Sequence, residues 1–399
     1  MTPLAAVAAG ACAAWLYLVL FHGAFWRADQ RLGEPPPPAS WPGVAAVVPA
    51  RDEAAVIAAS IGALLDQDYD GELTVVLADD ASSDGTADRA RARADRHPRG
   101  DRLVVAPAPP RPAGWVGKMW AVETGVARAE EVAPGARYLW LTDADVVHPP
   151  QQLRRLVAKA EAEGLDLTST MVLLWCRQGW ERLLIPAFVY FFQQLYPFRW
   201  VNDRRAATAG AAGGSMLVRA SALAAAGGIE RLRGEIIDDC ALGKLLKRRG
   251  AIWLGLSEGS RSIRPYGGLD AIWRMVARTA YTQLRYSPGR LAVAVVGLAL
   301  LYLVPPIAVL AWPWHQDAPA ALLGLVAWGL QSLSFLPTLR LYRRTPLLAP
   351  ALPVAGLLYL AMTVDSARRH HRGEGAYWKG RPGAGDPRAA SGGRAGGAS

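Results

Sequence analysis

Two aspartates separated by one residue, Asp143 and Asp145, follow an apolar run in the stretch Tyr138 to His148, YLWLTDADVVH. The run predicts a buried strand, which Pro149 and Pro150 end. Because alternate side chains of a strand share a face, both carboxylates can point at one site just past the strand. Two such acids suit Mg²⁺ or Mn²⁺ carrying a phosphate-bearing ligand. Taken alone, the pattern is more often that of a strand followed by a polar turn.

Charged residues also follow other apolar runs. The runs that predict strands are 44–50, 73–80, 102–108, 138–145, 166–174 and 251–256. They alternate with helical stretches, which is typical of an α/β sheet. Ligands of open α/β sheets bind at the carboxyl ends of the strands, so PARDE (Pro49 to Glu53) and ADDASSDGT (Ala78 to Thr86) can join the two aspartates in one crevice. Alternatively, the second stretch is a turn whose Ser83 and Asp84 cap the next helix.

The composition limits the class of protein. The 399 residues are 52% hydrophobic and 20% charged, with a formal net charge of +10, a pI near 9.8 and a mean hydropathy of +0.12. The charge suits nucleotide phosphates or an anionic membrane surface. We expect no nucleic-acid partner, because the chain has no recognisable nucleic-acid-binding motif. Cys12, Cys176 and Cys240 lie far apart without a C-x-x-C, which predicts a reducing compartment and no structural zinc.

The N-terminal stretch 4–26 carries no charge and is long enough to span a bilayer, which takes about 20 residues. Arg27 and Arg31 follow directly, so the positive-inside rule predicts that the next part of the chain is cytoplasmic. A stiff, proline-rich linker, EPPPPASWPG (34–43), then leads into the α/β pattern.

Further apolar segments lie near the C-terminus. Two spans are predicted at 291–312 and about 319–337, and three arginines then mark a return to the cytoplasm. The last segment, 347–364, either spans, which leaves the basic tail outside, or re-enters the membrane with breaks at Pro350 and Pro353. We favour the re-entrant form, in which the tail stays cytoplasmic.

Two segments are candidates for the acceptor side. Residues 180–201 are apolar and aromatic but contain Pro186 and Pro197; we expect an interfacial helix or the wall of a lipid groove, and the alternative is a helix inside a bundle. Residues 269–286 predict a basic amphipathic helix lying on the membrane. Its apolar positions are Leu269, Ile272, Trp273, Val276, Ala280 and Leu284, and its basic positions are Arg274, Arg278 and Arg285.

In this order, the motifs resemble those of family 2 glycosyltransferases, which have the GT-A fold. The stretch Pro49 to Glu53 resembles the family's P-x-x-N/D-E opening, whose acids face the nucleotide. DDASSDGT (79–86) resembles D-D-x-S-x-D-G-T, an acid of which binds nucleobase and ribose. The resemblance assigns the donor to Pro49, Arg51, Asp52, Glu53, Asp79, Asp80, Asp84, Lys118 and Asp143.

The remaining motifs concern the reacting groups. Lys118, in GWVGKMWAVETG, matches the stretch near the diphosphate, and Asp143-Ala-Asp145 matches the D-x-D that binds Mg²⁺ or Mn²⁺. Asp238-Asp239-Cys-Ala-Leu matches E/D-D-x-x-L, whose second acid is the base; this implies that Asp239 deprotonates the acceptor and that the anomeric carbon is inverted. Alternatively, Lys118 is a surface lysine, and the acid pair only complements the dipole of a helix start.

A narrower similarity is to the hopene-associated glycosyltransferases of bacterial hopanoid pathways. It rests on the N-terminal span and on GGSMLVRASAL (213–223), GGIERLRGEIIDD (227–239) and WKGR (378–381). Relatives acting on lipids carry Q-x-x-R-W after the base, whereas this chain has TQLRY at 282–286. Thr282 thus stands at the first position of this motif, and Arg285 and Tyr286 stand at the last two. We take Gln283, Arg285 and Tyr286 as the acceptor-side candidates.

The resemblance implies an α/β GT-A domain with a mixed, mostly parallel sheet, flanked by N- and C-terminal transmembrane helices. It implies a multi-pass enzyme of the bacterial inner membrane with a cytoplasmic catalytic domain, taking a nucleotide-sugar donor, most readily a UDP-sugar, and a lipid acceptor. The predicted segments are an anchor (1–33), a linker (34–43), the GT-A domain (44–268), an interface helix (269–290), transmembrane or re-entrant segments (291–365) and a basic, partly disordered tail (366–399).

Other functions stay open at this point. The acceptor of the sugar is a hopanoid, or alternatively a polyprenyl phosphate or another glycolipid. LWLTDADVV also fits the opening of haloacid dehalogenase-like phosphatases, in which Asp143 would be the nucleophile, although that opening normally begins its own domain. A non-catalytic scaffold that binds nucleotide-sugars is a third possibility. The six histidines form no ligand spacing, and we expect none of them to be catalytic.

Overall fold

The computed structural model describes residues 1–374, 377–378 and 381–382 and divides the chain into two compact units. The helical unit comprises Met1–Asp29, Trp175–Trp200 and Pro265–Glu374. The sheet unit comprises Gln30–Leu174 and Val201–Arg264, with the described C-terminal residues 377–378 and 381–382. Most of the predicted tail, including the middle of WKGR and all of 383–399, lies outside the described residues.

The sheet unit is built on an eight-stranded mixed sheet with the order β3-β2-β1-β4-β7-β6-β8-β5. The strands are β1 Gly43–Ala50, β2 Leu73–Asp79, β3 Leu103–Pro107, β4 Ala136–Leu141, β5 Val146–Val147, β6 Leu165–Leu173, β7 Met216–Arg219 and β8 Ala251–Ser262. Strands β3, β2, β1 and β4 pair in parallel, as do β6 and β8, whereas β7 runs antiparallel to both of its neighbours. The predicted α/β fold with a mixed sheet is confirmed. All six expected strands are present, and β5 and β7 were not predicted.

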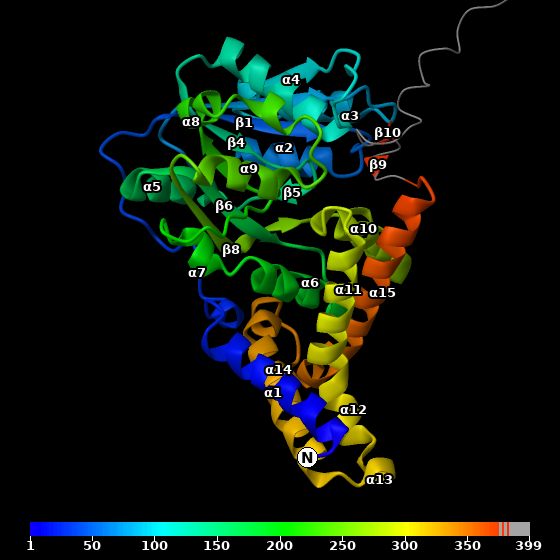
Figure 1. Cartoon of the computed structure of the whole chain (residues 1–399). Coiled ribbons are helices and arrows are strands. Elements are labelled where there is room, and N and C mark those ends of the chain that lie inside the picture. Colours follow the sequence, from blue (N-terminus) through cyan, green and yellow to red (C-terminus); the bar gives the residue numbers. More distant parts are fainter. Residues whose placement is uncertain (375–376, 379–380, 383–399) are drawn as a thin grey trace, which may run out of the picture. The chain divides into compact units, whose positions relative to one another are not determined.

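Helices cover both faces of this sheet (Figure 1). They are α2 Ile57–Leu65, α3 Thr86–Ala94, α4 Gly117–Val132, α5 Gln152–Glu163, α8 Ala220–Ala225 and α9 Asp238–Lys247, with short 3₁₀ turns η2 Gly100–Arg102 and η3 Ile229–Leu232. Helices α2, α3 and α5 share one core with one face of β1. Helix α4 lies against the other face, where Gly125 approaches Val47 so closely that an added β-carbon would be 2.4 Å from Val47 Cγ1. Because both faces are covered, β1 is an almost continuous apolar run.

The helical unit collects segments that are far apart in the chain. Its elements are α1 Pro3–Leu20, η1 Phe25–Arg27, α6 Glu181–Leu195, α10 Leu269–Gln283, α11 Pro288–Leu298, η4 Ala299–Leu303, α12 Val304–Leu310, α13 Trp312–His315, α14 Ala318–Leu341, η5 Pro346–Ala351 and α15 Leu352–His371; α7 Phe198–Asn202 crosses the boundary between the units. Four of its helical segments are long and apolar enough to cross a membrane: Pro3–Leu20, Pro288–Leu310, Ala318–Leu341 and Pro346–His371.

One of these segments contains a π-helical turn, η4, for a local reason. Pro305 has no backbone N–H and crowds the carbonyl of Leu301 four residues earlier. The released Leu301 carbonyl accepts hydrogen bonds from Trp15 Nε1 at 2.7 Å and from Gln331 Nε2 at 3.4 Å. The distortion therefore ties three apolar segments together.

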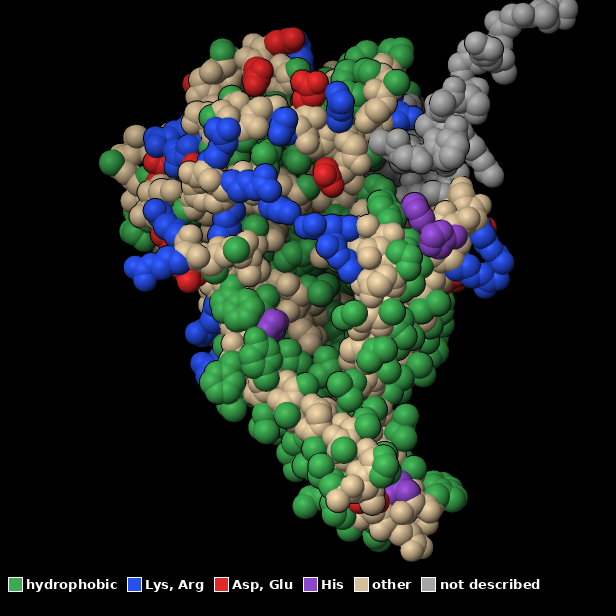
Figure 2. All heavy atoms as spheres, viewed as in Figure 1, with side chains coloured by type: hydrophobic (Ala, Val, Ile, Leu, Met, Phe, Trp, Pro, Cys, Tyr) green, Lys and Arg blue, Asp and Glu red, His purple; other side chains and the backbone are tan. Residues whose placement is uncertain are grey.

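The outer surface of the helical unit is apolar. Figure 2 shows hydrophobic side chains gathered over α1, α11, α12 and α14. Large side chains among them are well exposed, including Leu20, Val293, Val296, Leu322 and Leu333. Proteins that stay in water rarely expose contiguous apolar surfaces of this kind, whereas a bilayer would cover them.

Three details differ from the sequence-based expectations. Helix α6 packs within the helical unit, where Tyr190 and Gln193 hydrogen-bond Ser334 and Thr338 of α14, as in the bundle alternative. The apolar face of α10 packs on α15, where Trp273 Nε1 donates to Asp365 at 2.8 Å. The last segment has no internal break, because its prolines fall in η5 and in the first turn of α15.

Candidate active site

The loops after β1 and β2 interlock at the carboxyl edge of the sheet. The backbone N–H of Asp52 donates to Ser82 Oγ at 3.0 Å, and the Asp52 carboxylate accepts from the N–H of Ser83 at 2.9 Å. The N–H groups of Ala54 and Thr86 both donate to the Asp84 carboxylate, at 2.9 and 3.1 Å. Burial tends to raise the pKa of Asp84, but these hydrogen bonds outweigh it and the pKa is lowered. Asp84 therefore fastens the two loops together.

Two further predicted acids, Asp79 and Asp80, lie at the end of β2. Arg51 Nη1 is 3.6 Å from Asp80 Oδ2 and also donates to the Asp80 carbonyl. Asp79 accepts a hydrogen bond from the hydroxyl of Ser82. The structure thus brings Asp79 and Asp80 together with the PARDE loop, which carries Arg51, as the ends of the parallel strands β1 and β2 require.

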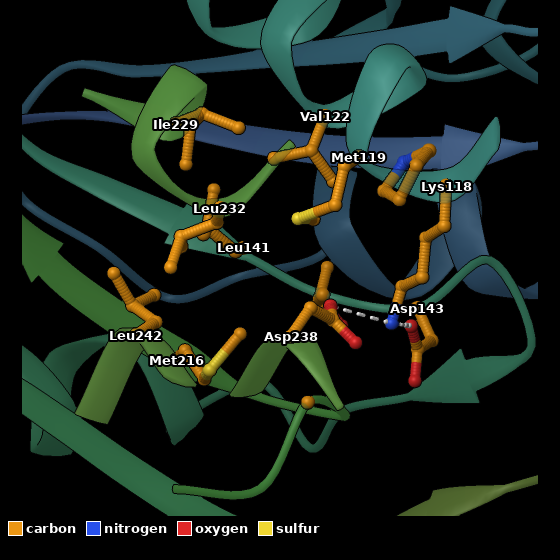
Figure 3. Close-up of a pocket in the computed structure, with 13 residues that line it drawn as sticks. Lys118, Met119, Val122, Leu141, Asp143, Met216, Ile229, Leu232, Asp238 and Leu242 are labelled. Carbon is orange, nitrogen blue, oxygen red and sulfur yellow. Dashed lines mark ion pairs between the residues drawn. The ribbon is translucent and has the colours of Figure 1, made fainter. Parts of the chain in front are cut away.

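Lys118 is the centre of a second charge cluster. It lies in the first turn of α4, and its Nζ is 3.1 Å from both Asp143 Oδ1 and Asp238 Oδ2 (Figure 3). Burial disfavours the charge, but Asp143, Asp238 and Asp239 outweigh it, so the pKa of Lys118 is raised and the ammonium stays protonated. The exposed lysine of the alternative interpretation is therefore wrong, since only 22% of this side chain is accessible.

Asp239 lies next to this cluster, in the first turn of α9. Its two carboxylate oxygens accept from the N–H groups of Gly213, at 3.0 Å, and Cys240, at 2.7 Å. Burial and the neighbouring Asp238 raise the pKa of Asp239 to about 6, although Lys118 and both hydrogen bonds lower it. At neutral pH the carboxylate is mostly ionised and still basic enough to take a proton.

The carboxylate of Asp145 accepts hydrogen bonds from two residues that we did not predict as its partners. Its Oδ2 accepts from Ser262 Oγ at 3.0 Å and from Arg264 Nε at 3.1 Å, and the same guanidinium pairs with Glu53. Burial, followed by the charge of Asp143, raises the pKa of Asp145 to about 6. Ser262 and Arg264 lie close to Asp145 because β8 continues to Ser262 and pairs with β5, which directly follows the D-x-D. The polar run SRSIRP after the predicted strand was the available signal.

A buried histidine, His148, is hydrogen-bonded to Thr142, the residue that precedes the D-x-D. His148 donates to or accepts from Thr142 and Ser260 at 2.8 Å each, and Thr142 also donates to the Gly214 carbonyl at 2.8 Å. Burial lowers the pKa of His148 to about 3, so the ring is neutral. The ring links the end of β4 to β8, and the Thr142 hydroxyl links the end of β4 to the loop that carries Gly213.

Lys118, Asp143 and Asp238 line one side of a small pocket (Figure 3). Its walls are apolar and come from α4, β4, β7 and η3, with Met119, Val122, Leu141, Met216, Ile229 and Leu232 among them. Its free volume is about 20 Å³. The charged groups therefore stand at the mouth of an apolar recess.

Residues 42–253, more than half of the chain, match the family model described as glycosyltransferase-like family 2. The chain belongs to glycosyltransferase family 2. The predicted family and enzyme class are confirmed, and the phosphatase alternative is wrong. No protein in a comparison with curated sequences is a significant match to this glycosyltransferase.

Two solved structures are similar to parts of this chain. A mannosyltransferase from Pyrobaculum calidifontis, solved with GDP-mannose and Mn²⁺, is 20% identical with a TM-score of 0.51; the match covers 90% of this chain and 99% of that one. Glucosyl-3-phosphoglycerate synthase from Mycobacterium tuberculosis is 19% identical with a TM-score of 0.39, covering 61% and 79%. The first similarity supports the GT-A-like arrangement of the glycosyltransferase.

The carboxylates of this site suit a metal ion whose other ligands are phosphate and water. Among the described residues there is no group of three or more His, Cys, Asp or Glu side chains that could hold an ion alone. Mg²⁺ in phosphate-binding sites commonly takes only one or two carboxylates, with phosphate and water as its other ligands. Asp143 and Asp145 meet that requirement, and a cation bound there would offset the burial and the Asp143 charge that raise the pKa of Asp145.

The acceptor-side candidates belong to the helical unit of the glycosyltransferase, at the end of α10. Gln283 Nε2 donates to the Tyr196 hydroxyl at 2.6 Å. Arg285 and Tyr286 both have positive φ, 51° and 55°. The ring of Tyr286 stacks on His370, with centroids 4.4 Å apart. Two successive non-glycine residues in this conformation mark a constrained turn.

Proposed function

We propose that this protein is a membrane-bound, inverting glycosyltransferase that moves a sugar from a nucleotide-sugar to a hydroxyl group of a lipid. The observation that carries the proposal is the position of Lys118 between Asp143 and Asp238, beside the buried carboxylate of Asp239. This cluster offers one cation for a leaving group and one base for an acceptor. The apolar surface of the helical unit supports a lipid partner.

On the donor side, the interlocked loops after β1 and β2 would bind the nucleoside. We assign this role to Pro49, Arg51, Asp52, Glu53, Asp79 and Asp80, with Asp84 holding the loops in place. Lys118 would stand beside the diphosphate. Asp143 and Asp145 would hold Mg²⁺ or Mn²⁺, which supplies charge neutralisation for the departing diphosphate. A UDP-sugar is our first expectation, and a GDP-sugar the alternative, as in the mannosyltransferase complex.

On the acceptor side, Asp239 would take the proton of the acceptor hydroxyl while its oxygen attacks the anomeric carbon. The bond to the diphosphate oxygen breaks on the opposite side, so the configuration is inverted. The N–H groups of Gly213 and Cys240 hold the carboxylate in place for this step. Asp238 would keep the pKa of the base raised.

The lipid is proposed to be a hopanoid, on the resemblance of the motifs named above, and a polyprenyl phosphate is the second candidate. Gln283, Arg285 and Tyr286 remain the proposed acceptor-side residues. The constrained turn at Arg285 and Tyr286 supports a binding role, because strained backbone is retained where surrounding contacts stabilise it.

We also propose that the last apolar segment is re-entrant. Trp328 Nε1, in the middle of α14, donates to the Pro350 carbonyl at 3.0 Å, so α15 starts halfway along α14. Its far end packs on α10, the helix that precedes α11, and Figure 1 shows α15 approaching α10. The tail would then lie on the cytoplasmic side, at the bacterial inner membrane.

Cysteine labelling tests this topology. Gln316→Cys lies between α13 and α14 and Glu374→Cys follows α15, whereas the three native cysteines are buried. With a membrane-impermeant maleimide, we expect the first variant to react in intact cells and the second only after permeabilisation. Labelling of both in intact cells would show that α15 spans.

A donor screen tests the function itself. Detergent-solubilised protein is supplied with UDP- and GDP-sugars and Mg²⁺ or Mn²⁺, with and without hopanoid or polyprenyl phosphate, and release of the nucleoside diphosphate is followed. The proposal predicts metal-dependent release that one lipid stimulates. Tight donor binding without release under any condition would favour the scaffold.

A further inference from the structure

The apolar recess between the charged groups is the feature that the proposed reaction leaves unused. We infer that it binds a methyl-sized apolar substituent of the donor sugar. The inference rests on the proposed function, because a sugar whose reacting carbon lies near Asp143 and Asp238 would cover the mouth of the recess. A 6-deoxy sugar or the acetyl group of an N-acetylamino sugar would supply such a methyl group.

The size of the recess limits what can enter. Its free volume of about 20 Å³ corresponds to roughly one water-sized or methyl-sized group and is far too small for a sugar ring. Two of its walls are the side chains of Met119 and Met216, which are flexible and adapt to small changes in the shape of a ligand. The sugar ring itself would therefore stay at the mouth.

The chemistry of the walls selects an apolar group. Val122, Leu141, Ile229 and Leu232 offer no hydrogen-bonding side chain. The one hydroxyl nearby, that of Thr142, is already bonded to His148 and to the Gly214 carbonyl. A buried water needs about two to four polar partners, and a sugar hydroxyl placed here would have none on the apolar side.

The wall formed by η3 is fixed in place. The N–H of Val116, at the start of α4, donates to the carbonyl of Arg233, directly after η3, at 2.7 Å. The same segment continues into Asp238 and Asp239 at the start of α9. A substituent that fills the recess would thus contact the segment that carries the proposed base.

The test compares donors that differ at one substituent on full-length protein in detergent. UDP-glucose is compared with UDP-N-acetylglucosamine, and GDP-mannose with its 6-deoxy analogue, by displacement of a fluorescent nucleotide. We expect one methyl-bearing donor to bind at least about ten-fold better than its partner, the usual effect of a methyl-sized difference in an apolar pocket. The pair that shows the difference identifies the sugar class.

Val122→Ile should abolish that preference, because the extra methyl group fills the recess. Val126→Ile, one turn along the same helix and away from the recess, is the matched control and should keep it. Met216→Ala enlarges the recess and should favour an N-propionyl over an N-acetyl donor, which keeps the test valid if the isoleucine variant folds poorly. Free UDP or GDP should bind all folded variants equally.

Equal binding within both donor pairs, or the same loss in the two isoleucine variants, would overturn the inference while leaving the donor site intact. Failure of every nucleotide to bind the wild-type protein would instead overturn the proposed function, and this inference with it.

Discussion

Replacing Lys118 by methionine should raise the pH at which the enzyme becomes active. The ammonium is the one cation of this cluster, and it lowers the pKa of Asp239, which burial and Asp238 raise to about 6. Without Lys118 the carboxylate keeps its proton to a higher pH. Since the base must be ionised to accept a proton, kcat/KM on the acidic side should fall off at higher pH than in the wild type.

The geometry sets the size of this shift. The position that a β-carbon would take on Gly213 is 3.5 Å from Lys118 Nζ and 3.6 Å from Asp239 Oδ2. At most about 7 Å therefore separates the two charges, which gives roughly 2.4 kcal/mol at an effective dielectric constant of about 20. That energy equals about 1.7 pKa units. Allowing for solvent at the mouth, we expect a shift of about one to two pH units.

The assay is the pH profile of kcat/KM from about pH 5 to 9. K118M should also lower the maximal rate, because the lysine stands beside the proposed diphosphate, but the pH of half-maximal activity does not depend on that amplitude. K244M removes an exposed lysine from the same helix as Asp239 and should leave the profile unchanged. An unshifted acid side in K118M would refute the charge coupling and the assignment of the base.

Three further predictions concern other residues of the sheet unit. D238N should move the acid side of the profile about one unit lower, because a neighbouring negative charge no longer raises the pKa of the base; a shift upward would contradict this. R264Q should tighten Mn²⁺ binding about five-fold in the absence of donor, measured by electron paramagnetic resonance, since a partly exposed guanidinium no longer competes for Asp145. Unchanged affinity would show that the ion binds elsewhere. G125A should lower the free energy of unfolding by about 2 kcal/mol, because its methyl group would overlap Val47, and an unchanged melting temperature would contradict this packing.

The sequence predicted the sheet unit well because its signals are local. Apolar runs define the parallel strands, and the carboxyl ends of parallel strands meet at one edge, so the placement of Asp79 and Asp143 at that edge follows from topology. Strand β7 escaped prediction because its four residues, Met216–Arg219, are too short to show a period, and β5 is shorter still.

Residues brought in by tertiary contacts could not be predicted in the same way. Arg264 reaches Asp145 only because β8 extends beyond its apolar part and pairs with β5. His148 has no ligand spacing in the sequence and gains its role from partners that include Ser260, far along the chain. In the helical unit, hydropathy predicted the apolar segments, but packing decides which faces are buried, and the face of α6 that lies against α14 could not be predicted for that reason.

The most direct test of the account is sugar transfer by Asp239→Asn, measured with the donor and lipid identified by the screen. The variant keeps the shape of the side chain and can still accept one of its two backbone hydrogen bonds, so donor affinity should match the wild type. The account predicts a loss of transfer of about 10²- to 10⁴-fold, the usual contribution of a general base. Transfer at the wild-type rate would contradict the role of Asp239, and with it the proposed mechanism.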